Sequence, residues 1–133
     1  MIERRRLSWT FDSYFGEAVE KVKIQERSGG DDPVLRDFLR EIVPLQKQIQ
    51  RIILFGSRAR GTHLPDSDYD LLLVVDRKDR AFVDKIYDAV MEILLRHGRL
   101  ISLKCFTSEE MMQLSGLKTP FMQHIQKEGI AVG

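Results

Sequence analysis

The sequence of 133 residues has little that would place the protein in a membrane or outside the cell. Its one cysteine, Cys105, cannot form an internal disulfide, so we expect a reducing cytoplasm. No apolar run approaches the roughly 20 residues of a membrane-spanning helix, and residues 1–6 do not open a secretory leader. We therefore predict a cytoplasmic protein with no membrane association.

An excess of charge of either sign is also missing. The 21 Lys and Arg residues nearly balance the 20 Asp and Glu residues, which gives a formal net charge of +1. Such a balance provides no general attraction to nucleic acid, so we do not expect a nucleic-acid partner. Hydrophobic residues make up 43% of the chain, which is typical of a globular protein. We predict a single domain over 1–133, in which 1–50 form an N-terminal helical extension.

Apolar spacing divides the chain into helices and strands. The expected helices are 11–27, a second one that opens at Asp32-Pro33 and ends near Pro44, the long helix 80–97, and two short helices that open at Thr107 and Thr119. The expected strands are 51–55, 69–75, 100–106 and 130–132. The pattern predicts an α+β fold with a small mixed sheet and helices packed on it. Residues 71–75 are apolar at successive positions, which indicates a central strand that is buried on both faces. Trp9 and the helix 11–27 could form a homo-oligomer contact or cover the sheet of their own chain.

The most informative segment joins the first two predicted strands. Gly56 and Ser57 follow the apolar run 52–55, and glycine allows a backbone to approach a phosphate closely. A helix that began at this point would direct its first amides toward an anion. Arg58 and Arg60 could neutralise a triphosphate, because guanidinium groups match phosphate oxygens. This turn is therefore a candidate nucleotide-binding segment.

Two carboxylates follow at the start of the next strand. Asp68 and Asp70 are two residues apart, so on an extended strand their side chains leave the same face. Mg²⁺ is commonly held by one or two carboxylates together with the oxygens of a bound phosphate. We therefore predict that Asp68 and Asp70 bind Mg²⁺ and are the catalytic pair.

Two other classes of protein also use closely spaced acids. A calcium-binding loop that began at Asp66 would need glycine and glutamate where the chain has Leu71 and Arg77, which argues against it. Sugar-nucleotide transferases carry an Asp-x-Asp motif, but they do not require Gly-Ser upstream of it, and 133 residues is short for them.

The segment resembles a known family. Residues 54–61, followed by Ser67-Asp68-Tyr69-Asp70-Leu71-Leu72, are similar to the minimal nucleotidyltransferases (MNT type) of the DNA polymerase beta superfamily, whose signature is Gly-Ser, ten residues and Asp-x-Asp. A weaker resemblance extends over 119–129.

The resemblance implies a fold, an activity and a site. The fold would be a palm-like α+β sheet. The activity would be the transfer of a nucleoside monophosphate, AMP from ATP in the first instance, to a hydroxyl of a partner protein. Gly56 and Ser57 would grip the triphosphate, and Asp68 and Asp70 would hold Mg²⁺. Small members of the family often pair with a helical HEPN-type protein, and some act as antitoxins that adenylylate it.

One position departs from the family pattern. Active members usually carry a third carboxylate on the strand after the long helix, where this chain has Ser102, with Lys104 as its neighbour on the same face. Neither side chain can act as a carboxylate, and general-base assistance is worth roughly 10²–10⁴ in rate. Triphosphate binding is therefore better supported than turnover. The alternative to an active enzyme is a catalytically weak, nucleotide-binding antitoxin or regulatory subunit paired with a HEPN-type protein.

Overall fold

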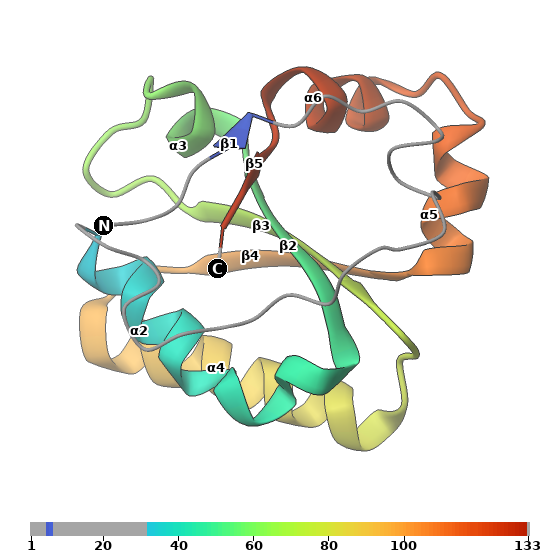
Figure 1. Cartoon of the computed structure of the whole chain (residues 1–133). Helices are drawn as coiled ribbons and strands as arrows, with labels where there is room; N and C mark the ends of the chain where they lie inside the picture. Colours follow the sequence, from blue (N-terminus) through green and yellow to red (C-terminus); the bar gives the residue numbers. More distant parts are fainter. Residues whose placement is uncertain (1–4, 7–31, 133) are drawn as a thin grey trace.

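A mixed sheet of five strands forms the centre of the computed structural model, which describes residues 5–6 and 32–132 (Figure 1). In spatial order the strands are β1 (Arg5–Arg6), β5 (Ile130–Ala131), β2 (Ile49–Phe55), β3 (Tyr69–Val75) and β4 (Ile101–Thr107). The pair β2–β3 is antiparallel and the pair β3–β4 is parallel. The predicted mixed α+β fold is thus confirmed. Trp9 and the predicted helix 11–27 lie outside the described residues.

Strand β3 lies between β2 and β4 and is the most deeply buried part of the sheet. Residues 71–75 are each 0% exposed, because the helices cover both faces of this strand. The expectation of a buried strand at 71–75 is therefore confirmed. Its first residues, Tyr69 and Asp70, mark the point where the apolar strand gives way to the polar loop before it.

Helices cover the two faces of the sheet unequally (Figure 1). On one face lie α2 (Pro33–Glu41), the 3-10 helix η1 (Val43–Gln48) and α4 (Arg80–His97), and on the other lie α5 (Ser108–Ser115) and α6 (Pro120–Glu128). Helix α3 (Gly56–Arg60) follows the end of β2, where it contacts α6 and also packs against the larger core. Alternate residues of each strand enter the two cores. Leu71 and Leu73 join the larger core under α2 and α4, and Leu72 and Val74 join the smaller core with α5 and α6.

The helix boundaries follow from local capping chemistry. The Asp32 carboxylate accepts hydrogen bonds from the amides of Val34 and Leu35, and Pro33 occupies the first turn of α2. Thr107 and Glu110 form the predicted capping box at the start of α5. Gly98, with φ of +66°, ends α4 in the left-handed conformation that glycine adopts readily.

Segment 43–48 differs from what its sequence suggests. The helix α2 ends before Pro44, as expected, but the chain then continues as η1, which the sequence pattern does not predict, and β2 begins at Ile49, two residues before the predicted strand. Ile42 and Leu45 are buried here, so the tight 3-10 turns carry apolar groups into the larger core. Part of the predicted N-terminal extension, α2 and η1, thus packs on the sheet.

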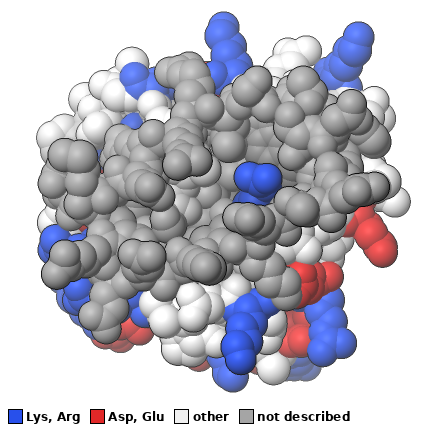
Figure 2. All heavy atoms as spheres, in the orientation of Figure 1, with Lys and Arg blue, Asp and Glu red and all other residues white. Residues whose placement is uncertain are grey.

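Charge on the described surface is mixed. Figure 2 shows Lys, Arg, Asp and Glu side chains close together along the lower edge of the face that it presents. Within the described residues, no helix combines the length and the apolar character needed to traverse a lipid bilayer.

Candidate functional site

The turn after β2 and the start of β3 meet at one point. Phe55 pairs with Asp70 in the antiparallel ladder, so Gly56 follows directly beside Asp70. Gly56 has a φ of +74°, and a Cβ added to it would overlap Oδ2 of Asp70. Glycine is required here for two reasons, its backbone conformation and the closeness of the carboxylate. The predicted turn and the predicted acids are therefore neighbours in space.

The Asp70 carboxyl lies in a half-buried and strongly charged environment. Burial is the main cause that raises its pKa, and the negative charge of Asp68 raises it further. The nearby cations Lys104 and Arg60 and the hydroxyl of Ser102 lower it, but the balance remains upward. A buried carboxyl beside a second acid favours a bound proton or a bound cation.

Asp68 and Asp70 contribute differently to this pair. Asp70 is a residue of β3, whereas Asp68 is exposed and lies in the loop just before that strand. They are close enough for the charge of Asp68 to act on Asp70. The structure thus brings together the two acids that the sequence singled out.

Ser102 lies directly beside Asp70 on the neighbouring strand. The parallel register pairs Asp70 with Ser102 and Leu72 with Lys104. The position where the family pattern has a third acid, as we align it, is therefore next to the acidic pair and holds a hydroxyl. Within residues 5–6 and 32–132, no group of three or more His, Cys, Asp or Glu side chains could hold a metal ion.

The donor set still fits Mg²⁺ that is bound together with a phosphate chain. Mg²⁺ retains waters readily and is often held by one or two carboxylates plus substrate phosphates. Asp68 and Asp70 match that requirement, and a cation would offset both the burial and the neighbouring charge of Asp68 that raise the pKa of Asp70. The site fits a metal that arrives with a nucleotide better than a metal held by protein groups alone.

Arg58 has a different environment from the one its sequence position suggests. It is only 9% exposed, its Nε donates to the Ser67 carbonyl at 3.0 Å, and its Nη2 donates to the Pro65 carbonyl at 3.1 Å. Its guanidinium lies over the Tyr69 ring, 3.8 Å from the ring centroid. These contacts occupy donors that the sequence analysis assigned to phosphate, and they tie the 61–68 loop to α3.

Tyr69 and Asp32 extend this set of contacts to α2. The Tyr69 hydroxyl donates to both carboxylate oxygens of Asp32, at 2.9 and 2.7 Å. Burial, and then the negative charge and hydrogen bonding of Asp32, raise the pKa of Tyr69. This arrangement cannot be predicted from the sequence, because the partners are separated by 37 residues and only the fold brings them together.

Arg60, in contrast, is exposed, and its charge is close enough to Asp70 to act on that carboxyl. Its Nη1 is 2.9 Å from Oε2 of Glu128, which links α3 to the end of α6. Its positive charge also lowers the pKa of Asp70, although burial outweighs it. Arg60 is therefore the arginine of the predicted pair that is near the acids.

Three phenylalanines on the same face of the sheet were also missed. Phe55 and Phe121 pack edge to face with ring centroids 5.7 Å apart, and Phe106 lies 6.1 Å from Phe121. All three pack against the smaller core. They connect β2, β4 and α6 on the face of the sheet that carries Asp70, and their packing holds α6 against that face.

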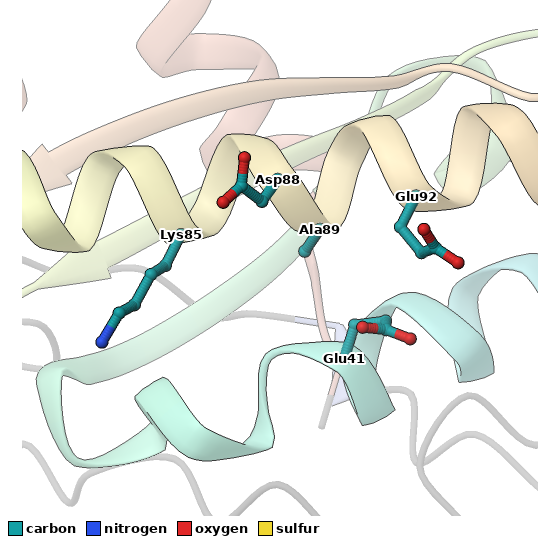
Figure 3. Close-up of a pocket in the computed structure, with 5 residues that line it drawn as sticks. All are labelled: Glu41, Lys85, Asp88, Ala89 and Glu92. Atoms are coloured by element: carbon teal, nitrogen blue, oxygen red, sulfur yellow. The ribbon is translucent and has the colours of Figure 1, made fainter.

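A polar hollow lies elsewhere, between α2 and α4 (Figure 3). Its lining residues are Glu41, Lys85, Asp88, Ala89 and Glu92. Arg96 contacts Glu41 at 3.1 Å and Glu92 at 2.8 Å, so two of the three acids already have a cationic partner. We interpret this acidic cluster as part of the contact between the two helices.

The chain is similar to known nucleotidyltransferases. The family model for the nucleotidyltransferase domain matches residues 34–118, which is more than half of the chain. The chain therefore belongs to this family, as a minimal nucleotidyltransferase of the DNA polymerase beta superfamily.

Three similar proteins come from Methanocaldococcus jannaschii, and each carries the name "Putative protein adenylyltransferase". The first is 34% identical over 82 residues, which cover 62% of this chain and 76% of the relative. The second is 36% identical over 80 residues and 54% of each chain. The third is 28% identical over 104 residues, which cover 74% of this chain and 95% of the relative.

The chain also has a more distant similarity to a solved structure. A structure described as "Crystal structure of the toxin-antitoxin with AMP-PNP" aligns with a TM-score of 0.43 and 20% sequence identity, over 69% of each chain.

Proposed function

We propose that this chain binds ATP together with Mg²⁺ where β2, α3 and β3 meet, and that it transfers AMP to a hydroxyl of a partner protein. Family membership gives the class of reaction. The names of the three relatives favour AMP as the group and protein as the acceptor. The observation that carries the proposal is the position of the Asp70 carboxyl, against Gly56 and within the field of Asp68. In this proposal the reaction takes place in the cytoplasm, in keeping with a single cysteine.

Each site residue has a distinct part in the proposal. The amides of Gly56 and Ser57 bind phosphate oxygens, and Arg60 adds positive charge from α3. Asp68 and Asp70 hold Mg²⁺, which, when bound, would neutralise the phosphates and polarise the reacting phosphorus. Arg58 keeps the 61–68 loop in place through its two carbonyl contacts, and so positions Asp68.

The chemical step is a single displacement. The acceptor oxygen bonds to the α-phosphorus, the bond from that phosphorus to the β-phosphate oxygen breaks, and pyrophosphate leaves. The proton of the acceptor hydroxyl passes to water. No carboxylate beside Asp70 on β4 assists this proton transfer, because Ser102 occupies that position.

Calorimetry and label transfer test the proposal in two stages. We expect Mg²⁺-dependent binding of ATP by the wild type, and transfer of label from α-labelled ATP to a protein acceptor, first tried with a helical protein encoded beside this chain. Asp70→Asn should abolish both. Asp66→Asn is the matched control, because Asp66 is an exposed acid of the same loop. Binding that Asp70→Asn leaves intact would reject the proposed site.

The register at Ser102 favours a second function, a nucleotide-binding antitoxin or regulatory subunit, paired with a HEPN-type protein, with weak or no turnover. Ser102→Asp separates the two functions. If the chain is a weak catalyst for want of an acid, this substitution should raise the transfer rate. An unchanged or lower rate would count against that explanation.

A further inference from the structure

Strand β4 presents a short polar surface beside Asp70, on the side away from α3. Ser102 pairs with Asp70, and Lys104 pairs with Leu72, one step further along the strand. Residues two apart on a strand share a face, so Ser102 and Lys104 lie on the face that also carries Asp70. The order across the sheet is β2 with α3, then Asp70 on β3, then Ser102 and Lys104 on β4.

This order assigns a role to each side of Asp70, given the function proposed above. A displacement at phosphorus proceeds with the attacking and leaving oxygens roughly in line. The pyrophosphate leaves on the side of Gly56, Ser57 and Arg60, where the triphosphate is proposed to bind. The acceptor hydroxyl must then approach from the opposite side, which is the side of β4.

The charge on this acceptor side is positive. Lys104 is exposed, and within the described residues it has no hydrogen bond or ion pair. Its ammonium is nevertheless close enough to Asp70 to act on that carboxyl. Strand β4 itself, with the sequence ISLKCFT, contains no acid, and Glu110 beyond it is bound to Lys78 at 2.8 Å. Among the described residues, Lys104 therefore presents positive charge on the side from which the acceptor approaches.

We propose that Ser102 and Lys104 form an acceptor subsite that selects a hydroxyl flanked by negative charge, such as a hydroxyl within an acidic protein segment. Lys104 attracts the flanking acid, and Ser102, a small residue with a hydroxyl, leaves room for the acceptor beside Asp70 and can hydrogen-bond to it. Single exposed charge pairs contribute modestly, and salt screens them. We therefore expect roughly a 2–5-fold preference for an acidic acceptor at low ionic strength, which diminishes at high salt.

A charge reversal tests this subsite. Two synthetic peptides carry the same Ser, Thr and Tyr residues, flanked by Glu in one peptide and by Gln in the other. The rate of AMP transfer from α-labelled ATP to each peptide is measured with the wild type, Lys104→Glu and Lys85→Glu. The last variant is the matched control, because Lys85 is an exposed lysine on α4 beside the polar hollow of Figure 3. Calorimetry with Mg²⁺ and ATP confirms that each variant retains its nucleotide site.

We expect the wild type and Lys85→Glu to favour the Glu peptide, and Lys104→Glu to lose or invert that preference. Equal preference in Lys104→Glu and the wild type would overturn the acceptor subsite while leaving the proposed transfer intact. A wild type that favours the Gln peptide would do the same. Failure to bind ATP with Mg²⁺, or to label any acceptor, would instead reject the proposed function, and the subsite with it.

Discussion

At the scale of single residues, the site depends on a carboxyl held where its charge is unfavourable. Burial and the charge of Asp68 raise the pKa of Asp70. A carboxyl whose pKa is higher in the folded than in the unfolded chain costs stability when it is ionised. That cost is absent below the unfolded pKa and complete above the folded one. An ionised carboxylate at position 70 therefore does not help the chain to fold. It would, however, help to hold a bound cation.

Asp70→Asn should separate stability from binding. The neutral amide removes the cost of ionisation, so the free energy of unfolding at pH 7 should stay the same or increase, while ATP binding with Mg²⁺ is lost. The stability difference from the wild type should shrink as the pH falls through the raised folded pKa of Asp70, and it should vanish below the unfolded pKa of an aspartate, about 4. Urea unfolding at several pH values measures this difference in the free energy of unfolding, with Asp66→Asn as the control. A variant that is less stable than the wild type at neutral pH would contradict this reading.

Gly56 and Gly61 allow a second comparison at this scale. Both have positive φ, +74° and +77°, but a Cβ on Gly61 would meet no atom within 4 Å, whereas one on Gly56 would overlap the Asp70 carboxylate. Gly61→Ala should therefore cost about 1 kcal/mol from the backbone alone. Gly56→Ala should cost about 1–3 kcal/mol more, because the carboxylate must move as well, and it should weaken ATP binding. Equal losses of stability in urea unfolding would show that the overlap is relieved without cost.

At the scale of elements, helix α3 and the 61–68 loop act as one unit through Arg58. This buried side chain donates to two loop carbonyls and stacks on Tyr69, and its Nη1 is 4.0 Å from Oδ2 of Asp32. A lysine offers a single point of charge and cannot reproduce the planar fork of donors. The position of the loop that leads into Asp68 therefore depends on an arginine at 58.

Arg58→Lys should loosen this unit. Leaving the Ser67 and Pro65 carbonyls without their donors should cost about 2–3 kcal/mol of stability. Hydrogen exchange should speed up in amides of the 61–68 loop and much less in β3. Arg60→Lys is the control, since the exposed pair with Glu128 should contribute about 1 kcal/mol or less. Unchanged exchange in the loop of the Arg58 variant would show that the loop holds its position without this residue.

The elements also show what the sequence could predict. The apolar pattern predicted the helix 80–97 and the strand 69–75, because burial on one or two faces imposes a repeat on residue types. Capping residues predicted the last helix, which Thr119 and Pro120 open and Gly129 ends. The spacing of Gly56 and Asp70 predicted their proximity. It could not distinguish Arg58 from Arg60, since both are cations two residues apart in one turn. Only the packing of Tyr69 and Asp32 directs one inward. The phenylalanines 55, 106 and 121 come from separate elements, so no local pattern connects them.

At the scale of the whole molecule, the two faces of the sheet differ in how many apolar side chains they bury and in which polar residues they carry. The larger core under α2 and α4 supplies most of the buried apolar side chains, and the opposite face carries Asp70, Ser102 and Lys104 beside a smaller core. The larger core and the proposed site therefore lie largely on opposite faces of the sheet. A substitution that weakens the α2–α4 contact should change stability without changing the site directly.

Asp37 tests this separation, because it ties α2 to the end of α4. Its Oδ2 is 2.8 Å from Nε2 of His97, and Arg96 and Arg40 lie within 4 Å. The His97 hydrogen bond is the main cause that lowers the pKa of Asp37. A carboxyl whose pKa is lowered on folding adds stability above the unfolded pKa and loses it as the pH falls through the folded one.

Asp37→Asn should therefore lose about 1.5–3 kcal/mol of stability at pH 7 and should flatten the acid limb of the stability curve. Urea unfolding from neutral to acidic pH measures this loss of stability, with Asp84→Asn, at an exposed position, as the control. ATP binding with Mg²⁺ should stay unchanged as long as the Asp37 variant remains folded. An Asp37→Asn variant whose acid limb matches that of the wild type, or whose ATP affinity falls, would mean that the two faces are not independent.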